Sequence, residues 1–390
     1  MSEVTFVTPR YGAEVFAGAE AGARQLAMRL AADGRGVQVL TTCALSMHTW
    51  EDHYPPGTTE EDGVTVRRLA VDQTRTPDFD AHSNDLLPRA TDATAEECER
   101  WIRAQGPTSA ALIEAIAAVD DGVIIFYPYL YHPTVVGRRV ARVPTVLYPA
   151  AHDELPFRLP VFDEVFGGVD GFAFHTRAEQ ELVHARFPAT VTAPQTMLGL
   201  PVELDASPDP DAARSALGLG DEPFFLCLGR IDRAKGVHDL VERFGRYRAD
   251  GGAGRLVLAG TVGEEPPSGP GVICLGRVPE EHKNGLVAAA DVLINPSFYE
   301  SFSLVILEAW LAGTPVLVNG WCGPMAEHVV QSGGGLFYTG RADFDIALRR
   351  LAGDAEARTR MAAAGQAYVE RRYSWDAVRT RLDGLLDALS

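Results

Sequence analysis

The segment that decides the fold is DVLINPSFYESFSLVILEAWLAGTPVLVNG, residues Asp291–Gly320. It starts and ends with short apolar runs of the kind that form buried strands. Between them Leu304, Leu307 and Leu311 recur at helical spacing, and Gly313 stands where a helix would end. A strand, a helix and a second strand in this order predict two parallel strands joined by a right-handed crossover.

The same rhythm runs through both halves of the chain. The first half offers the expected strands VTFVTP, VQVLTT, GVIIFYPY, VPTVLYPAAH and GFAFHT, and the second offers FFLCLG, RLVLAG, VICLG, DVLINPS, TPVLVNG and GGLFYT. Their continuous apolar character favours parallel sheets covered on both faces. Residues 51–110 are more polar, and we interpret YPPGTTEEDG within them as a loop.

Length and composition indicate two globular domains. The chain has 390 residues, of which 46% are hydrophobic and 23% charged, which is too long for one ordinary core. The Pro-, Asp- and Gly-rich segment LPVELDASPDPDAARSALGLGDEP is interpreted as the linker. We expect two doubly wound, Rossmann-like α/β domains, 1–203 completed by a C-terminal helix at 374–390, and 204–373. Ligands of such sheets bind beyond the carboxyl ends of the strands, so a cleft between the domains is the expected site.

Charge and cysteine content exclude several classes of protein. The net charge of −18 argues against general nucleic-acid binding and supplies no polybasic anchor for anionic lipid. No apolar run reaches the ~20 residues of a membrane span, and the first residues lack the pattern of a secretion signal. Five scattered cysteines favour buried, reduced thiols over a disulfide or zinc framework. We therefore expect a cytoplasmic protein.

The segment LGRIDRAKGVHDL is a candidate phosphate site. A strand is expected to end at Gly229, and a helix to open at Gly236, with Arg230 and Lys235 in the loop between them. Cations beside the free N–H groups of a helix N-terminus attract phosphate. Only two of the 35 basic residues are lysines, Lys235 and Lys283, so a lysine in this loop points to a need for a compact charge. The alternative is an ordinary solvated loop.

Two glutamates in the fold-deciding segment are candidates for hydroxyl recognition. Glu300 lies in the turn before the expected helix, which Ser301 or Ser303 can cap, and Glu308 lies about two turns into it. Eight residues at ~100° each leave them roughly 80° apart, so they do not form one carboxylate pair. Carboxylates accept hydrogen bonds from sugar and ribose hydroxyls. The alternatives are a helix-terminal charge for Glu300 and a surface residue for Glu308, although VILEAWL is a costly place for an unpaired charge.

The motifs together resemble the retaining glycosyltransferases of family 4, which have the GT-B fold. The resemblance rests on GRIDRAKG, LGRVP, NPSFYESFSLVILEAWLAGTPVLVNG and SGGGLF in the second half, and on AGAE, AAHDE and HTRAE in the first. It covers nearly the whole chain, and the ordered combination is more specific than any single motif. The fold it implies is two Rossmann-like domains that face a central cleft.

The resemblance implies a role for each matching residue. Arg230 and Lys235 would bind the diphosphate of a nucleotide sugar, Glu308 the ribose, and Glu300 the donor sugar. His152 would lie near the reacting sugar. The remaining positions implied to bind the donor are Gly18 in the first loop, Arg277 and Val278 at the base, and the backbone of Ser303, Leu304 and Val305 at sugar and phosphate.

The sequence departs from the family pattern at two glycines. Family members often have two glycines in the first loop, where this chain has Ala17 and Gly18, and a glycine where this chain has Ser303. A methyl group at Ala17 would narrow the approach of a phosphate. None of these differences removes a charged group that the chemistry needs, so the resemblance implies an active enzyme.

The implied reaction moves a hexosyl group from a nucleoside-diphosphate sugar to an acceptor hydroxyl with retention, by same-face substitution and with no metal ion or other cofactor. Three alternatives remain open at this point: another enzyme on the same fold, such as a sugar-nucleotide epimerase or a phosphorylase, a non-catalytic nucleotide-sugar-binding protein, and a structural scaffold. Neither the base and sugar of the donor nor the acceptor, whether glycan, lipid-linked sugar or natural product, follows from the sequence. Residues 74–107, on the expected acceptor side, carry no chemical signature.

Overall fold

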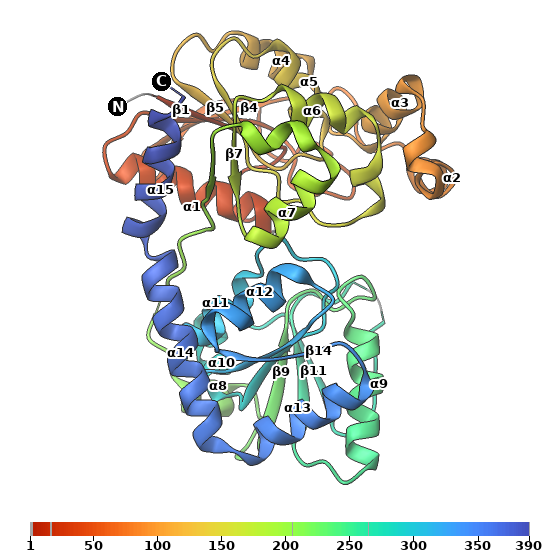
Figure 1. Cartoon of the computed structure of the whole chain (residues 1–390), viewed down its shortest axis with the longest axis vertical. Coiled ribbons are helices and arrows are strands. Elements are labelled where there is room, and N and C mark those ends of the chain that lie inside the picture. The colour runs from red at the N-terminus through yellow and green to blue at the C-terminus, as the bar shows by residue number, and fades with distance from the viewer. Residues whose placement is uncertain (1–2, 16–17, 205, 264, 390) are drawn as a thin grey trace. The chain divides into compact units, whose positions relative to one another are not determined.

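The chain divides into two units, each built on one sheet. The computed structural model describes residues 3–15, 18–204, 206–263 and 265–389 (Figure 1). One unit comprises Met1–Pro201 with Val378–Ser390, and the other comprises Val202–Ala377. Two doubly wound α/β units are therefore confirmed.

The N-terminal unit has an eight-stranded sheet in the order β3-β4-β2-β1-β5-β6-β7-β8. All neighbouring strands are parallel except β3 and β4, which are antiparallel. The strands are β1 Val4–Val7, β2 Val37–Thr42, β3 Gly57–Glu61, β4 Val64–Leu69, β5 Val123–Phe126, β6 Thr145–Leu147, β7 Gly171–Phe174 and β8 Gln195–Met197. Successive strands are added on one side of β1 up to β4 and on its other side from β5 onward, which makes the gap between β1 and β5 the switch point of the sheet.

Helices cover this sheet through a large apolar core. They are α1 Gly18–Ala32, α2 Phe79–Leu86, α3 Ala95–Gln105, α4 Ala110–Ala117, α5 His132–Val140, α6 Val161–Gly168 and α7 Arg177–Arg186. Thr94 and Glu97 form a capping box at the start of α3, which satisfies two otherwise unpaired backbone N–H groups. The core cluster draws on β1, β2, β5, β6 and β7 and on α3, α4 and α6.

The expectation of a loop at residues 54–63 was wrong. Residues 57–61 form β3, which pairs with β4 at the edge of the sheet. Four of the five residues of β3 are exposed, so the strand has no apolar face that a hydrophobicity pattern could reveal.

The C-terminal unit has a six-stranded, fully parallel sheet in the order β11-β10-β9-β12-β13-β14. All six strands fall where the sequence predicts them: β9 Phe224–Leu228, β10 Arg255–Ala259, β11 Val272–Gly276, β12 Val292–Asn295, β13 Val316–Asn319 and β14 Gly335–Tyr338. The central strands are buried along nearly their whole length, as expected of strands covered on both faces.

The helices of this unit are α8 Pro210–Ala216, α9 Val237–Ala249, α10 Glu280–Ala289, α11 Leu304–Leu311, α12 Gly323–Ser332, α13 Arg341–Gly353 and α14 Ala355–Tyr373. Helices α9 and α13 lie side by side (Figure 1) and share one core cluster with alternate residues of the strands. The strand residues between them, such as Leu226 and Leu293, point to the opposite face of the sheet and are equally buried. The sheet is therefore covered on both faces.

Two segments near the unit boundaries differ in detail from the sequence prediction. The segment interpreted as a linker contains α8, whose first turn is capped by Asp209 and whose Arg214 donates to the carbonyl oxygen of Ala289. The last helix, α15 Trp375–Asp387, crosses the boundary at Val378. Its Arg381 donates to the carbonyl oxygen of Leu198 at 2.8 Å, which ties the end of the chain to the N-terminal unit.

Helix α11 is anchored by a tryptophan that packs against glycines. Trp310 is fully buried, and its indole N–H donates to the carbonyl oxygen of Gly334 at 2.7 Å. A Cβ atom added at Gly365, on α14, would lie 2.3 Å from Trp310 Cγ. The absence of a side chain at Gly365 therefore lets α14 approach the indole closely, and it fixes the helix that carries Glu308.

Replacing Gly365 with alanine should lower the free energy of unfolding of the C-terminal unit. Overpacking a core costs about 1–3 kcal/mol, and alanine recovers about 1 kcal/mol of helix propensity. Gly245→Ala on α9 is the matched control, because a Cβ atom there meets nothing within 4 Å and should stabilise. Urea unfolding of both variants checks this, and stabilisation by Gly365→Ala would contradict the packing account.

Cysteine burial agrees with the sequence prediction at four positions and differs at one. Cys43, Cys98, Cys227 and Cys322 are buried free thiols, whereas Cys274 is exposed. Cys274 lies on β11, the edge strand of its sheet. Among the described residues, no helix combines the length and the apolar composition needed to cross a membrane.

Candidate active site

The C-terminal sheet brings its candidate residues to one edge. Strands β9 and β12 are parallel neighbours at the point where the strand order reverses. Arg230 follows the end of β9, and Glu300 follows the end of β12. Because the carboxyl ends of parallel strands share one edge, both loops lie at the switch point where doubly wound sheets bind ligands.

An aspartate that the sequence reasoning missed organises the first loop. Asp232 is only 7% exposed. One of its carboxylate oxygens accepts the backbone N–H of Lys235 at 2.8 Å, and the other pairs with Nε of Arg230. Asp232 thus holds the loop in a turn and pairs with the guanidinium of Arg230. The signal in the sequence was an aspartate inside a short loop, because aspartate side chains often accept hydrogen bonds from nearby backbone N–H groups in turns.

Gly236 fixes this loop against the next strand. It precedes α9 with φ 73°, in the left-handed region that favours glycine. A Cβ atom there would lie 2.6 Å from the carbonyl oxygen of Pro296, just past β12. The N-terminus of α9 has no side-chain cap at Gly236, and its first N–H groups face the same edge as Arg230 and Lys235.

Lys235 and Glu300, predicted separately from the sequence, are in contact. Lys235 Nζ donates to Glu300 Oε1 at 2.8 Å. The lysine side chain is 33% exposed and the glutamate 19%. Both groups therefore sit at a partly buried surface, where a ligand can reach them and where charge interactions are stronger than in bulk water.

Helix α11 presents one half-buried face beside Glu300. Leu304, Val305 and Glu308 are of intermediate exposure, whereas most other residues of the helix are buried. Ser303 precedes the helix with φ 64° and forms no side-chain cap. Its hydroxyl instead accepts a hydrogen bond from Asn295 Nδ2 at 2.9 Å, so of the two serines expected as possible caps, Ser303 does not cap α11.

The expected base contacts lie two strands away on the same edge. Arg277 and Val278 follow directly after β11 and precede α10. Arg277 is exposed and Val278 is half-buried. Helix α10 carries Lys283, whose Nζ lies 3.4 Å from Glu308 Oε1, so the second lysine of the chain contacts the second candidate glutamate.

Two predicted site residues belong to the N-terminal unit. Gly18 is the first residue of α1 and is exposed, and a Cβ atom there would meet nothing within 4 Å. Its neighbour Ala17 lies outside the described residues. His152 follows β6, and its Nδ1 lies 3.4 Å from Glu154 Oε1. Glu154 in turn accepts the hydroxyl of Tyr129 at 2.9 Å, which orients the carboxylate beside the histidine.

A buried glutamate holds the loop that contains His152. Glu179 is 1% exposed, and its carboxylate accepts the N–H of Ala151 at 2.7 Å and the N–H of His175 at 2.6 Å. Ala150 has φ 53°, an unfavourable conformation for alanine that costs about 1 kcal/mol or more. Glu179 therefore holds a strained loop whose next residue is His152.

The same carboxylate ends a buried hydrogen-bond chain. His175 Nδ1 lies 3.3 Å from Glu179 Oε2, and His175 Nε2 lies 2.8 Å from the hydroxyl of Tyr127. A neutral His175 that donates from Nδ1 and accepts at Nε2 satisfies both contacts. His175 and Glu179, two members of this hydrogen-bond network, both belong to the sequence motif HTRAE. Their partners Tyr127 and Ala151 are remote in sequence.

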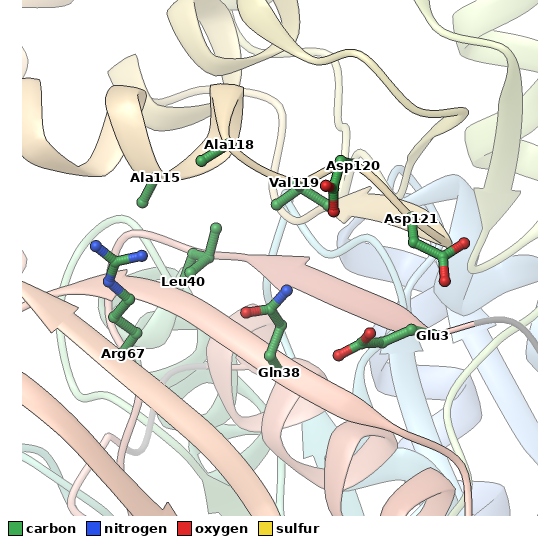
Figure 2. Close-up of a pocket in the computed structure, with 9 residues that line it drawn as sticks. All are labelled: Glu3, Gln38, Leu40, Arg67, Ala115, Ala118, Val119, Asp120 and Asp121. Atoms are coloured by element: carbon green, nitrogen blue, oxygen red, sulfur yellow. The ribbon is translucent and has the colours of Figure 1, made fainter.

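A cavity of about 130 Å³ lies near the amino ends of the strands of the N-terminal sheet. Figure 2 shows Arg67 at one end and Glu3 and Asp121 at the other. Glu3 lies just before β1 and Asp121 just before β5, and Asp120 adds a third carboxylate. An acidic cavity at the amino ends of the strands is unsuited to a diphosphate.

Comparisons with known proteins agree with the resemblance seen in the sequence. Residues 222–354 match the family model described as Glycosyl transferases group 1. A D-inositol 3-phosphate glycosyltransferase from Stackebrandtia nassauensis is 28% identical over 391 residues, covering 90% of this chain and 82% of the relative.

Solved structures share the fold along the whole chain. Sucrose-phosphate synthase from Thermosynechococcus elongatus has a TM-score of 0.69 at 19% identity, covering 100% of this chain and 99% of that one. HepE from Anabaena, solved with UDP and glucose, also has a TM-score of 0.69 at 16% identity, with full coverage of both chains. The solved structures show that the chain has the GT-B fold. The sequence of its C-terminal unit is similar to glycosyl transferases group 1, and nearly the whole chain is similar to a D-inositol 3-phosphate glycosyltransferase.

Proposed function

We propose that the protein is a retaining, metal-independent glycosyltransferase that moves a sugar from a nucleoside diphosphate to an acceptor hydroxyl. The observation that carries this is the grouping of Arg230, Lys235 and Glu300 at the carboxyl ends of β9 and β12. Two cations beside an uncapped helix N-terminus are suited to a diphosphate. In HepE the fold holds UDP and glucose, and we extend that ligand class to this chain.

In this proposal each side chain binds a part of the donor. Arg230 and Lys235 bind the diphosphate and stabilise the charge that develops on it as the sugar leaves. Preorganised charge of this kind contributes about 3–4 kcal/mol per donor group at oxyanion sites. Glu300 accepts hydroxyls of the sugar, and Glu308 accepts hydroxyls of the ribose. Arg277 and Val278 contact the base through their backbone, and the backbone of Ser303, Leu304 and Val305 meets sugar and phosphate.

Retention is proposed through same-face substitution. Glu300 is held by Lys235 and serves the sugar hydroxyls rather than the anomeric carbon. The nearby thiol of Cys322 is no nucleophile at neutral pH, because burial raises its pKa to about 11. The leaving phosphate would then accept the proton of the acceptor hydroxyl, with His152 beside the reacting sugar and the Gly18 loop near the phosphate.

One experiment tests reaction class and metal dependence together. The purified protein is incubated with candidate nucleotide sugars and hydroxyl acceptors, with and without EDTA, and the product is examined by NMR. We expect transfer with the anomeric configuration of the donor and an unchanged rate in EDTA. An inverted product would overturn the proposed mechanism, and loss of activity in EDTA that is restored by Mg²⁺ would overturn metal independence.

A further inference from the structure

Both lysines of the chain contact the two glutamates of the fold-deciding segment. All other basic residues are arginines. Lys235 Nζ lies 2.8 Å from Glu300 Oε1, and Lys283 Nζ lies 3.4 Å from Glu308 Oε1. The proposed function gives Lys235 a role at the diphosphate but leaves Lys283 without one. The parallel between the two pairs directs attention to Lys283.

Lys283 is positioned between the base-contacting loop and Glu308. It lies in the first turn of α10, which begins two residues after Val278. Its side chain is 28% exposed and that of Glu308 is 23% exposed. Glu280, one turn earlier, approaches the same ammonium at 3.2 Å but is 65% exposed. Lys283 and Glu308 therefore form the partly buried part of this cluster.

The charge of Lys283 is maintained at neutral pH. Burial lowers its pKa, but Glu308 and Glu280 outweigh this effect, and the pKa of Lys283 is raised above its usual value. The ammonium is therefore positive at neutral pH. A permanent positive charge next to Glu308 keeps a carboxylate acceptor in place at the half-buried face of α11.

An arginine would serve this position differently. The planar guanidinium pairs with both oxygens of a carboxylate at once. A lysine ammonium acts as a point charge, and the contact between Lys283 and the Glu308 carboxylate is made through Oε1. The second oxygen has two lone pairs that can accept two hydroxyls. This explains why a chain that otherwise uses arginine has a lysine here.

We propose that Lys283 is a positioning residue that holds Glu308 through Oε1, so that Oε2 accepts the vicinal 2′ and 3′ hydroxyls of a ribose and selects ribonucleotides over 2′-deoxyribonucleotides. This inference rests on the proposed function, which places Glu308 at the ribose. It goes beyond that function by explaining how the site distinguishes ribose from 2′-deoxyribose in the nucleotide.

The test compares a ribonucleoside diphosphate with its 2′-deoxy counterpart by titration calorimetry. UDP, GDP and ADP are screened first, and the tightest binder is paired with dUDP, dGDP or dADP. A hydrogen bond to a charged group implies that wild type prefers the ribonucleotide by roughly 10- to 150-fold. Lys283→Met removes the contact that holds Oε1 of Glu308, and Lys283→Arg would pair with both oxygens of the carboxylate. Both variants should therefore reduce that preference to within about threefold.

Three further measurements separate positioning from a structural role. Glu280→Gln, the matched control, should keep the wild-type preference. Lys283→Arg should keep the melting temperature of wild type, because its charge remains. The donor KM should rise in both Lys283 variants while kcat stays within about threefold, since the ribose is remote from the reacting atoms.

The outcomes distinguish this inference from the proposed function. If wild type binds no nucleoside diphosphate, both are wrong. If wild type binds one and Lys235→Ala weakens it, the donor site stands. In that case an unchanged ribose preference in Lys283→Arg, or no preference in wild type, overturns only the role of Lys283.

Discussion

Replacing Lys235 with alanine should lower the rate of donor cleavage by about 10²- to 10³-fold, the effect of removing one preorganised donor from an oxyanion site. The lysine is one of three cations in the loop between β9 and α9, and its ammonium contacts Glu300. In the proposed function its loss removes a positive charge beside the leaving diphosphate, and it leaves the Glu300 carboxylate without the ammonium that contacts it. The measurement is release of nucleoside diphosphate from the donor that binds wild type.

The control for this prediction is Arg246→Ala. Arg246 lies in the last turn of α9 and pairs with the exposed Glu242, so the variant removes one positive charge far from the helix N-terminus. We expect activity within about twofold of wild type, since exposed i,i+4 pairs contribute about 0.3–0.5 kcal/mol. A Lys235→Ala enzyme that is folded and as active as Arg246→Ala would contradict the assignment of the diphosphate loop.

Replacing Glu179 with glutamine should destabilise the N-terminal unit and impair catalysis in the enzyme that remains folded. An amide supplies one acceptor oxygen where the carboxylate supplies two, so its NH₂ group would face the backbone N–H of Ala151 or His175. Breaking a buried charged network of this kind costs about 3–5 kcal/mol. The proposed function puts His152 beside the reacting sugar, and misplacement of such a group by about 1 Å reduces the reaction rate by ~10²-fold.

Glu181→Gln on the same helix is the matched control. Its side chain is 64% exposed and pairs with Arg177, so we expect a change below about 0.5 kcal/mol and wild-type activity. The readouts are urea unfolding and kcat measured at a temperature where both variants are folded. If Glu179→Gln matched Glu181→Gln in both readouts, Glu179 would not hold the histidine loop.

The C-terminal sheet could be predicted strand by strand because each strand is a continuous apolar run bounded by glycine or proline. Strand β3 could not, because an exposed edge strand of polar residues has no hydrophobic periodicity. Helix α8 was concealed within a segment rich in Pro, Asp and Gly. Asp209 followed by Pro210 was nevertheless a helix-start signal, an N-cap residue and a proline at the first helical position.

The candidate site could be predicted only in part for a related reason. Arg230, Lys235 and Glu300 follow strand ends, and strand order in a parallel sheet brings strand ends together. The contact between Lys283 and Glu308 depends instead on how two helices pack, which spacing along the chain does not reveal. The contact between Glu179 and Ala151 could not be predicted either, because the two residues are 28 positions apart in the sequence.

The most direct test of the donor site is a thermal-shift panel of UDP, GDP, ADP and TDP on the wild-type protein. A diphosphate at 100 times its Kd stabilises the folded state by about 2.7 kcal/mol, which corresponds to a rise of about 5–10 °C for a unit of this size. We predict such a rise with at least one ribonucleoside diphosphate, and its loss in Lys235→Ala. A folded protein whose melting temperature no nucleotide changes would contradict the account.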